Sequence, residues 1–234
     1  MFIVIAGGGL KGISLAAQLV GRHDVLVIDR DPRVCDYVRD ELGAMAHLGT
    51  ATSTKTLEAI GLSRADVAVA LMRDDADNLA FILLANRYGV RHRLVRMREP
   101  DFEQAFQLAG ATGIVSSVAP IVDQLMIAIE YPGIKALNRL GKGRIDVFEV
   151  AVPDDGRVVG MAIEAIARLE DFPDSCSFVA VEAPDGTIAI AKGTTRIPPG
   201  AIVIVLAMAP ELDRVLSFLT QRAPGRAGAV RSTP

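Results

Sequence analysis

Short apolar runs alternate with helical patterns over residues 1–130 of the chain. Each run is rich in β-branched residues and short enough for a buried strand, and the apolar positions after it recur with helical spacing. Glycine, proline and acidic residues give start and stop signals at the ends of the helical segments. The predicted strands cover residues 1–6, 24–28, 44–48, 67–71, 93–97 and 113–115. Such strand–helix units with short connections predict a parallel, doubly wound α/β sheet with strand order 3-2-1-4-5-6.

The first strand–helix unit carries the most specific motif. Gly7, Gly9 and Gly12 form a Gly-x-Gly-x-x-Gly turn between strand and helix, and Asp29 closes the second strand. Gly7 permits a tight turn, Gly9 lets the backbone approach phosphates, and Gly12 lets the helix pack on the strand. The helix N-terminus attracts an anion, and Asp29 is placed to bind a ribose. The motif predicts a Rossmann-type nucleotide fold; the alternative is that the glycines serve packing only.

The pattern breaks at Tyr131-Pro132-Gly133, which predicts a domain boundary. We expect a nucleotide-binding domain over residues 1–132 and a linker over 133–144 that contains a short crossover helix at 134–140. A small α+β domain follows over 145–221, with a helix at 160–169 and a tight hairpin turn at 184–186. Residues 222–234 are rich in Gly, Pro, Arg and Ser, and this composition predicts a disordered tail.

Composition narrows the class of protein. Half of the 234 residues are apolar, enough for a sizeable core, and the net charge of −3 has no basic stripe, which argues against nucleic-acid binding. Cys35 and Cys176 lie far apart without metal-ligand spacing, as is typical of reduced thiols. Met1 leads directly into a strand, and no apolar run approaches the roughly 20 residues that span a bilayer. We therefore expect a cytoplasmic protein.

Further motifs lie at the predicted strand ends and helix starts. They are Val27-Ile28-Asp29-Arg30-Asp31, Gly49-Thr50-Ala51-Thr52, Asp66-Val67-Ala68-Val69-Ala70-Leu71, Asp74-Asp75-Ala76-Asp77-Asn78-Leu79, Leu94-Val95-Arg96-Met97-Arg98-Glu99-Pro100 and Gly110-Ala111-Thr112-Gly113-Ile114-Val115. With the glycine turn and the strand entry at residues 198–205, they make the chain similar to the RCK (KTN) family over residues 2–219. This family comprises cytosolic regulatory subunits of Trk/Ktr-type potassium transporters and the gating domains of potassium channels.

The resemblance implies a regulatory role without catalysis. Such subunits bind ATP, ADP or NAD(H) in the first domain, form homodimers that assemble into rings of eight domains, and act on a potassium-translocating membrane subunit or channel. The protein would then be cytoplasmic and peripheral to the inner face of the membrane through this partner. The ligand would change the shape of the ring and thereby the pore.

The resemblance also implies which residues contact the nucleotide. They are Gly7, Gly8, Gly9, Leu10, Lys11, Gly12, Asp29, Arg30, Asp31, Thr50, Ala51, Leu71, Met72, Arg96 and Arg98. The glycine turn would hold phosphates by its backbone, and the acid after the second strand would take the ribose, flanked by the next two residues. The Thr-Ala pair would border the adenine, and the apolar pair after the fourth strand would cover its other side. The arginines of the fifth strand would reach a phosphate or a neighbouring protomer.

The sequence departs from the family pattern at three places. Leu10 stands where many members have an arginine that reaches the terminal phosphate, and Lys11 is the candidate substitute. Thr50 replaces the usual acid before the adenine-facing alanine. Ser116-Ser117 stands where metal-holding members carry a glutamate, so we predict no metal through that position.

Other interpretations remain open at this point. Asp29 disfavours NADP, whose 2′-phosphate it would repel, but it does not separate NAD(H) from ATP/ADP. Asp74, Asp75 and Asp77 resemble a metal cluster, yet acids in a first helical turn typically interact with the helix dipole. An NAD-dependent oxidoreductase would need a proton donor, and residues 145–219 contain no His. A free-standing sensor of another small ligand is the third hypothesis.

Overall fold

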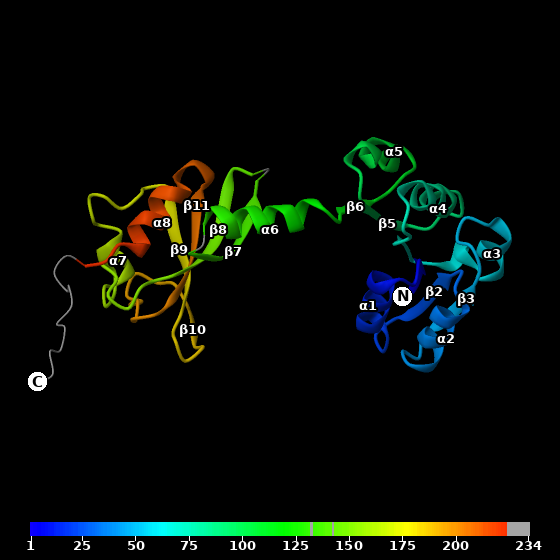
Figure 1. The fold of residues 1–234 in the computed structure, drawn as a ribbon, viewed down its shortest axis with the longest axis horizontal. Helices are drawn as coiled ribbons and strands as arrows, with labels where there is room; N and C mark the ends of the chain where they lie inside the picture. Colours follow the sequence, from blue (N-terminus) through cyan, green and yellow to red (C-terminus); the bar gives the residue numbers. More distant parts are fainter. Residues whose placement is uncertain (132, 142, 224–234) are drawn as a thin grey trace, which may run out of the picture. The chain divides into compact units, whose positions relative to one another are not determined.

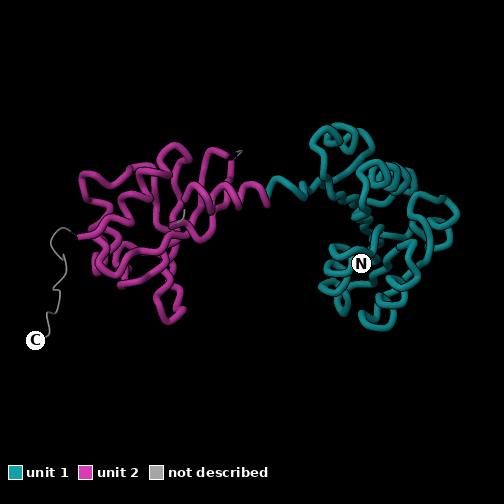
Figure 2. The backbone as a smooth tube through the Cα atoms, in the orientation of Figure 1, with its two compact units in different colours: residues 1–120 teal, residues 121–234 magenta. Residues whose placement is uncertain are grey.

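The computed structural model describes residues 1–131, 133–141 and 143–223. The chain divides into two compact units, residues 1–120 and 121–234, which Figure 2 colours separately. Each unit has its own sheet and hydrophobic core, so each is described by itself.

The first unit is a six-stranded sheet in the order β3-β2-β1-β4-β5-β6, and every neighbouring pair is parallel (Figure 1). The strands are β1 (Phe2–Ala6), β2 (Asp24–Asp29), β3 (Met45–Leu48), β4 (Val67–Ala70), β5 (His92–Met97) and β6 (Gly113–Ser116). The helices are α1 (Leu10–Leu19), α2 (Pro32–Asp40), α3 (Thr54–Ala59), α4 (Asp75–Arg87) and α5 (Glu103–Leu108), with short 3₁₀ turns at Leu62–Arg64 and Pro100–Phe102. The predicted doubly wound sheet and its strand order are confirmed.

Helices cover both faces of this sheet, which explains why its strands read as continuous apolar runs. Side chains alternate between the two faces along a strand. Val4 of β1 packs in the core to which α3, α4 and α5 contribute, where Phe81 and Phe106 are fully buried. Ile3 and Ile5 pack in the opposite core, to which α1 and α2 contribute. The central strand β1 is therefore fixed from both sides.

The strand order reverses at β1, because β2 and β4 lie on its two sides. At such a switch point, the connections leave the carboxyl ends of the two neighbouring strands in opposite directions, and a crevice opens between them. The topology thus defines where a ligand site is expected.

The second unit contains a five-stranded antiparallel sheet in the order β10-β9-β11-β8-β7 (Figure 1). Its elements are β7 (Ile134–Leu140), β8 (Ile145–Ala151), α7 (Ile163–Ile166), β9 (Cys176–Glu182), β10 (Ile188–Ile190), β11 (Ile202–Met208), a 3₁₀ turn (Ala209–Glu211) and α8 (Leu212–Thr220). Helix α8 packs Val215, Phe218 and Leu219 into the core of this unit. Helix α6 (Ala119–Glu130) spans the division between the two units.

The short crossover helix predicted over residues 134–140 is wrong. This segment is strand β7, which pairs with β8 and belongs to the sheet of the second unit rather than to a linker. Gly141 and Gly143 follow it with positive φ values of 58° and 80°, which suits a tight turn between antiparallel strands. Pairing with β8 supplies the backbone partners that a helix would have provided.

The helix predicted over residues 160–169 is also mostly wrong, since only Ile163–Ile166 is helical. Gly160 has a φ of +80°, a left-handed conformation that a right-handed helix excludes. Ala162 instead forms an isolated bridge with Arg196. Tertiary pairing therefore shortens a segment that has helical periodicity.

The predicted disordered tail begins too early. Arg222 forms a bridge with Gly156, and the N–H of Ala223 donates to the carbonyl of Asp155 at 2.9 Å. The remainder of that prediction, residues 224–234, lies outside the described residues.

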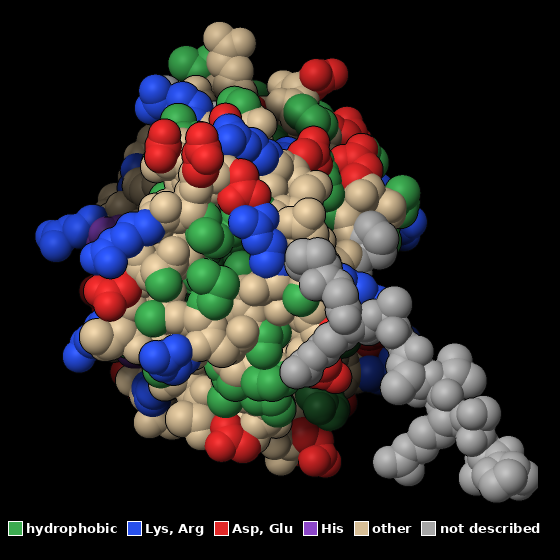
Figure 3. Space-filling view, turned by 90° about the vertical axis from the view of Figure 1, so that its left-hand side faces the viewer, with side chains coloured by type: hydrophobic (Ala, Val, Ile, Leu, Met, Phe, Trp, Pro, Cys, Tyr) green, Lys and Arg blue, Asp and Glu red, His purple; other side chains and the backbone are tan. Residues whose placement is uncertain are grey.

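The surface mixes charges of both signs. On the face shown in Figure 3, Lys and Arg side chains lie among Asp and Glu side chains, with apolar patches between them. Within the described part of the chain, no helix has both the length and the apolar character that crossing a bilayer requires.

One buried carboxylate predicts a pH-dependent stability. Asp146 of β8 is 1% exposed, and its Oδ1 lies 3.8 Å from Arg139 Nε without a hydrogen bond. Burial raises the pKa of Asp146 above its ordinary 3.8, and Arg139 opposes this. The pKa of Asp146 is thus higher in the folded state than in the unfolded state. The free energy of unfolding therefore falls as the pH rises from 3.8 through the raised pKa, because the buried carboxyl ionises less readily than the exposed one.

We therefore expect Asp146→Asn to raise the urea midpoint of unfolding at neutral pH, with a smaller gain below pH 3.8, where wild-type Asp146 is protonated. Asp174→Asn, which changes an exposed acid of the same unit, serves as the control. A lower midpoint for Asp146→Asn at neutral pH would show that the pair with Arg139 stabilises the fold.

Candidate functional site

An open pocket of about 480 Å³ lies at the carboxyl edge of the parallel sheet, around its switch point. This volume suits a small-molecule ligand. The predicted site residues that line it are Gly7, Gly9, Leu10, Lys11, Asp29, Arg30, Thr50, Ala51, Leu71, Met72, Arg96 and Arg98. Ile28, Gly49 and Arg73 also line it and were not predicted. The other three lie beside the pocket: Gly8 is in the glycine turn, Gly12 is buried within α1, and Asp31 is the N-cap of α2.

Gly7 brings the ends of β1 and β4 into contact. It has a φ of 101°, and a Cβ there would lie 2.9 Å from the carbonyl carbon of Leu71 and from the amide nitrogen of Met72. Its N–H donates to the carbonyl of Ile28 at 2.9 Å. Only glycine combines this conformation with this approach. The floor of the pocket is thus formed by backbone.

Helix α1 opens directly into the pocket. Gly9 is its N-cap, has no side chain to occupy the orphan N–H groups, and a Cβ there would meet nothing within 4 Å. The first turn contains no acidic residue. The first N–H groups of a helix lack intrahelical partners and carry partial positive charge. This end of α1 can therefore receive an anion such as a phosphate.

Asp29 ties β2 to the glycine turn. Its Oδ2 accepts a hydrogen bond from the N–H of Gly8 at 2.6 Å, and its Oδ1 accepts one from the N–H of Asp31 at 2.9 Å. A carboxylate offers about four acceptor positions, so two remain for a ligand. Asp31 caps α2 by accepting from the N–H of Arg33 at 2.9 Å. Asp29 is thus placed both to organise the turn and to receive hydroxyl groups.

The pocket lining is strongly positive. Lys11, Arg30, Arg73, Arg96 and Arg98 line it, against a single acid at the end of β2. Arg30 is exposed and lies 3.8 Å from Asp77, a pair that solvent weakens. A lining of this charge suits an anionic ligand.

Comparison with known proteins agrees with this geometry. The TrkA-N domain family matches residues 3–117. Over 173 residues, the chain is 31% identical to a Trk system potassium uptake protein TrkA homolog of Methanothermobacter thermautotrophicus, covering 74% of this chain and 80% of that protein. The chain belongs to the TrkA family.

Other relatives extend the match. The chain is 26% identical over 227 residues to the Trk system potassium uptake protein TrkA of Vibrio alginolyticus, covering 94% of this chain but 49% of that protein. It therefore spans about half the length of that relative. The resemblance to RCK regulatory subunits is confirmed.

Two solved structures are similar as well. The GsuK RCK domain is 25% identical with a TM-score of 0.53, and the match covers 92% of this chain and 46% of that one. A GsuK channel bound to NAD is 25% identical with a TM-score of 0.51, covering 92% of this chain and 38% of that one.

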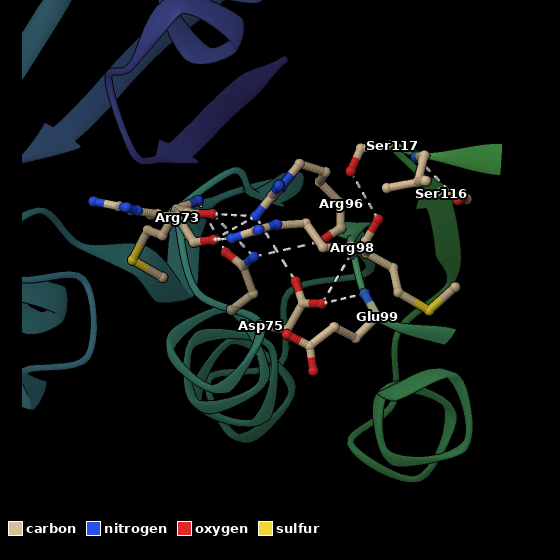
Figure 4. Close-up of polar contacts among 11 residues, drawn as sticks. Arg73, Asp75, Arg96, Arg98, Glu99, Ser116 and Ser117 are labelled. Atoms are coloured by element: carbon tan, nitrogen blue, oxygen red, sulfur yellow. Dashed lines mark hydrogen bonds and ion pairs between the residues drawn. The ribbon is translucent and has the colours of Figure 1, made fainter. Parts of the chain in front are cut away.

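In this TrkA-family chain, Arg96 lines the pocket but is engaged by the protein itself. Its Nη2 donates to the carbonyls of Met72 and Arg73, each at 2.8 Å (Figure 4). Burial lowers the pKa of Arg96, with Asp75 opposing that effect, and an arginine stays protonated under either influence. Part of its hydrogen-bonding capacity is therefore not free for a phosphate.

The two serines at the end of β6, Ser116 and Ser117, have structural partners (Figure 4). Ser117 Oγ donates to the carbonyl of Met97 at 3.0 Å, and Ser116 Oγ accepts from the N–H of Ala119 at 3.1 Å. Within the described residues, no group of three His, Cys, Asp or Glu side chains is arranged to hold a metal. The expectation of no metal at this position stays a prediction.

Sequence reasoning missed Arg73, Gly49 and Ile28 as pocket residues; Gly49 and Ile28 lie within the quoted motifs, but neither was assigned a ligand contact. A simple topological signal would have found them. Arg73 lies three residues after the end of β4, Gly49 directly follows β3, and Ile28 precedes the last residue of β2. Residues at the carboxyl ends of strands beside a switch point meet at one edge.

The glycine turn gives a matched stability test. A Cβ at Gly12 would lie 1.9 Å from the carbonyl oxygen of Gly7, which is backbone and is held by the sheet. We expect Gly12→Ala to lower the free energy of unfolding by about 1–3 kcal/mol. Gly9→Ala adds the same methyl group into open space and should change stability little. Equal urea midpoints for the two variants would contradict this account of the turn.

Proposed function

We propose that this chain binds an adenine nucleotide, NAD(H) or ATP/ADP, in the pocket and thereby regulates potassium flux through a separate membrane subunit. The observation that carries the proposal is the open N-terminus of α1 beside Asp29, in a positively charged pocket at the switch point. The proposed partner is a Trk/Ktr-type potassium-translocating subunit or a potassium channel.

The pocket residues fit each part of such a ligand. The N–H groups at the start of α1 suit a pyrophosphate, and the free acceptor positions of Asp29 suit the ribose hydroxyls. Thr50 and Ala51, next to Gly49 after β3, border the place for the adenine, while Leu71 and Met72 offer an apolar surface opposite. Adenosine and pyrophosphate are common to NAD(H) and ATP/ADP, so these elements accept either class.

The relatives support the biological setting. The curated relatives are potassium uptake proteins by name, and one similar structure is a channel bound to NAD. We propose that this chain forms a homodimer that assembles into a ring of eight domains, cytoplasmic and peripheral to the membrane through its partner. In such a ring, a nucleotide changes gating only through a difference in its affinity for two ring shapes.

The proposal makes binding without turnover the expected behaviour. The decisive experiment is titration of ATP, ADP, NAD and NADH against the purified chain by calorimetry, with the mass measured in each state. We expect saturable binding of at least one nucleotide and a mass above that of the 24.9 kDa monomer. Binding of none of the four would refute the proposal. Consumption of NADH with a substrate would favour the oxidoreductase hypothesis instead.

Asp29 provides the first matched variant. Asp29→Asn keeps the shape of the side chain but loses its negative charge and one acceptor, so nucleotide affinity should fall by about 1–3 kcal/mol. Asp24→Asn changes the exposed acid at the other end of β2 and should leave affinity unchanged. Equal affinities for the two variants in calorimetry would remove Asp29 from the site.

Lys11 provides the second matched variant. It is exposed at the start of α1 and lines the pocket, where the residue before it is Leu10 rather than a cation. We expect Lys11→Ala to weaken ATP binding by about 1 kcal/mol, because a charge-assisted contact to phosphate is lost. Lys55→Ala, on the exposed side of α3, is the control. An unchanged ATP affinity for Lys11→Ala would show that Lys11 does not replace the missing arginine.

A further inference from the structure

Asp75 joins the start of α4 to the chain that leaves β5. It is 6% exposed, and its Oδ2 accepts hydrogen bonds from the N–H groups of Arg98 at 2.8 Å and Glu99 at 2.9 Å (Figure 4). Both donors lie more than twenty residues away along the chain. The helix-dipole interpretation describes Asp74 better, since Asp74 is exposed and makes no side-chain cap hydrogen bond. Asp75 therefore has a role of its own.

Asn78 and Arg96 hold the loop between β4 and α4. Asn78 is fully buried; its Oδ1 accepts from the N–H of Met72 at 2.9 Å, and its Nδ2 donates to the carbonyl of Met72 at 3.2 Å. The same Nδ2 lies 3.3 Å from the carbonyl of Arg96. With the bonds from Arg96 Nη2 to Met72 and Arg73, side chains of α4 and β5 fix the loop that forms one wall of the pocket.

Arg96 and Asp75 close this network. Arg96 is 8% exposed, and its Nη2 lies 3.8 Å from Asp75 Oδ1, which has no hydrogen-bond partner within the described residues. The buried carboxylate thus balances the buried guanidinium while each bonds to backbone of another segment. Removing either charge would leave the other buried and uncompensated.

The network fixes the backbone of two further arginines, Arg73 and Arg98, which form no ion pair within the described residues. The carbonyl of Arg73 is held by Arg96, and the N–H of Arg98 is held by Asp75. Both side chains are exposed and line the pocket. Among the ion pairs of residues 1–131, 133–141 and 143–223, none involves Arg73 or Arg98. Arg98 Nη1 also donates to the carbonyl of Arg73 at 3.4 Å, which leaves the other N–H groups of this exposed guanidinium, and the Arg73 side chain, to face a ligand.

We infer that Asp75, Asn78 and Arg96 are positioning residues that set Arg73 and Arg98 for the phosphate groups of the nucleotide. This inference rests on the proposed function. It assigns Arg96 to the support of the pocket wall rather than to direct phosphate contact. Asp29, Thr50 and Ala51 lie outside the network, and in the described part of the chain only the backbone of Met72 links it to the proposed adenine contacts. Loss of the network should therefore weaken binding of a phosphate-rich nucleotide much more than binding of adenosine.

The test compares ATP with adenosine in calorimetric titrations of the full chain. Asp75→Asn is isosteric and keeps one acceptor oxygen for the N–H groups of Arg98 and Glu99, but it removes the negative charge that strengthens these bonds and places an NH2 group beside Arg96. We expect it to weaken ATP binding about tenfold, as for the loss of one charge-assisted hydrogen bond, and to leave adenosine affinity within about twofold. Asp74→Asn removes the same charge from the neighbouring exposed position and should match wild type for both ligands.

Two further variants separate positioning from direct contact. Arg96→Lys keeps the charge but loses the planar fork, and we expect a loss of ATP affinity of about tenfold, as in Asp75→Asn. Asp75 and Arg96 act in one network. The double variant Asp75→Asn/Arg96→Lys should therefore bind ATP no more than about twofold more weakly than the single variant with the lower ATP affinity. If the losses of ATP affinity in the two single variants multiply in the double variant, Arg96 contacts the ligand independently and its positioning role is overturned. Arg73→Ala/Arg98→Ala leaves the network intact and should also lose ATP but keep adenosine.

Amide hydrogen exchange tests the network without any ligand. Asp75→Asn should speed exchange at the N–H groups of Arg98 and Glu99, and Asp74→Asn should not. Two outcomes would overturn the inference alone, provided that the wild-type chain binds ATP. In the first, Asp75→Asn has an unchanged affinity for ATP. In the second, Asp75→Asn loses affinity for ATP and for adenosine equally. Failure of the wild-type chain to bind ATP, ADP, NAD or NADH would overturn the proposed function and this inference with it.

Discussion

The close packing of Gly12 against the carbonyl of Gly7 decides where α1 begins and what its first turn faces. With a Cβ separation of 1.9 Å, no side chain fits between the helix and the strand that precedes it. The helix therefore starts directly over the end of β1, and its unpaired N–H groups open on the carboxyl edge of the sheet. The anion-binding property of the site follows from this one backbone contact.

The same turn is bound to both neighbours of β1. Gly8 donates to Asp29 at the end of β2, and Gly7 touches the backbone of Leu71 beyond the end of β4. The carboxylate that we propose for the ribose thus also holds the glycine turn. Because both roles depend on the same oxygen atoms, the geometry of the turn and the recognition of a sugar are coupled.

The sequence predicted the first unit well because its strongest signals agree: β1 and β3 are followed directly by glycine, and β2 is followed by Asp31, which caps α2. Residues 134–140 lack that agreement. This seven-residue segment mixes apolar residues with Lys135, Asn138 and Arg139 and is too short for its periodicity to separate helix from strand, so pairing with β8 decides. Gly160 shows the same limit: it has a left-handed φ, and its N–H and carbonyl bond to Ile197 and Arg196, which lie far away in the sequence. At the site, the motif indicated the glycine turn and Asp29, but adjacent acids look alike in sequence. Asp75 rather than Asp74 is buried because β5 ends beside it, and that contact links segments more than twenty residues apart.

The pocket has two sides that are built differently, and this difference bears on nucleotide choice. On the α1 side, backbone N–H groups and Asp29 present themselves to features shared by NAD(H) and ATP/ADP. On the opposite side, the exposed charges of Arg73 and Arg98 stand on loops that the buried network fixes. A terminal phosphate gains from those charges, whereas the nicotinamide riboside end of a dinucleotide, which carries no negative charge, does not. In the proposed complex, adenosine affinity therefore depends on Asp29 and the residues around the glycine turn, and discrimination between nucleotides depends on side chains held from behind the pocket wall.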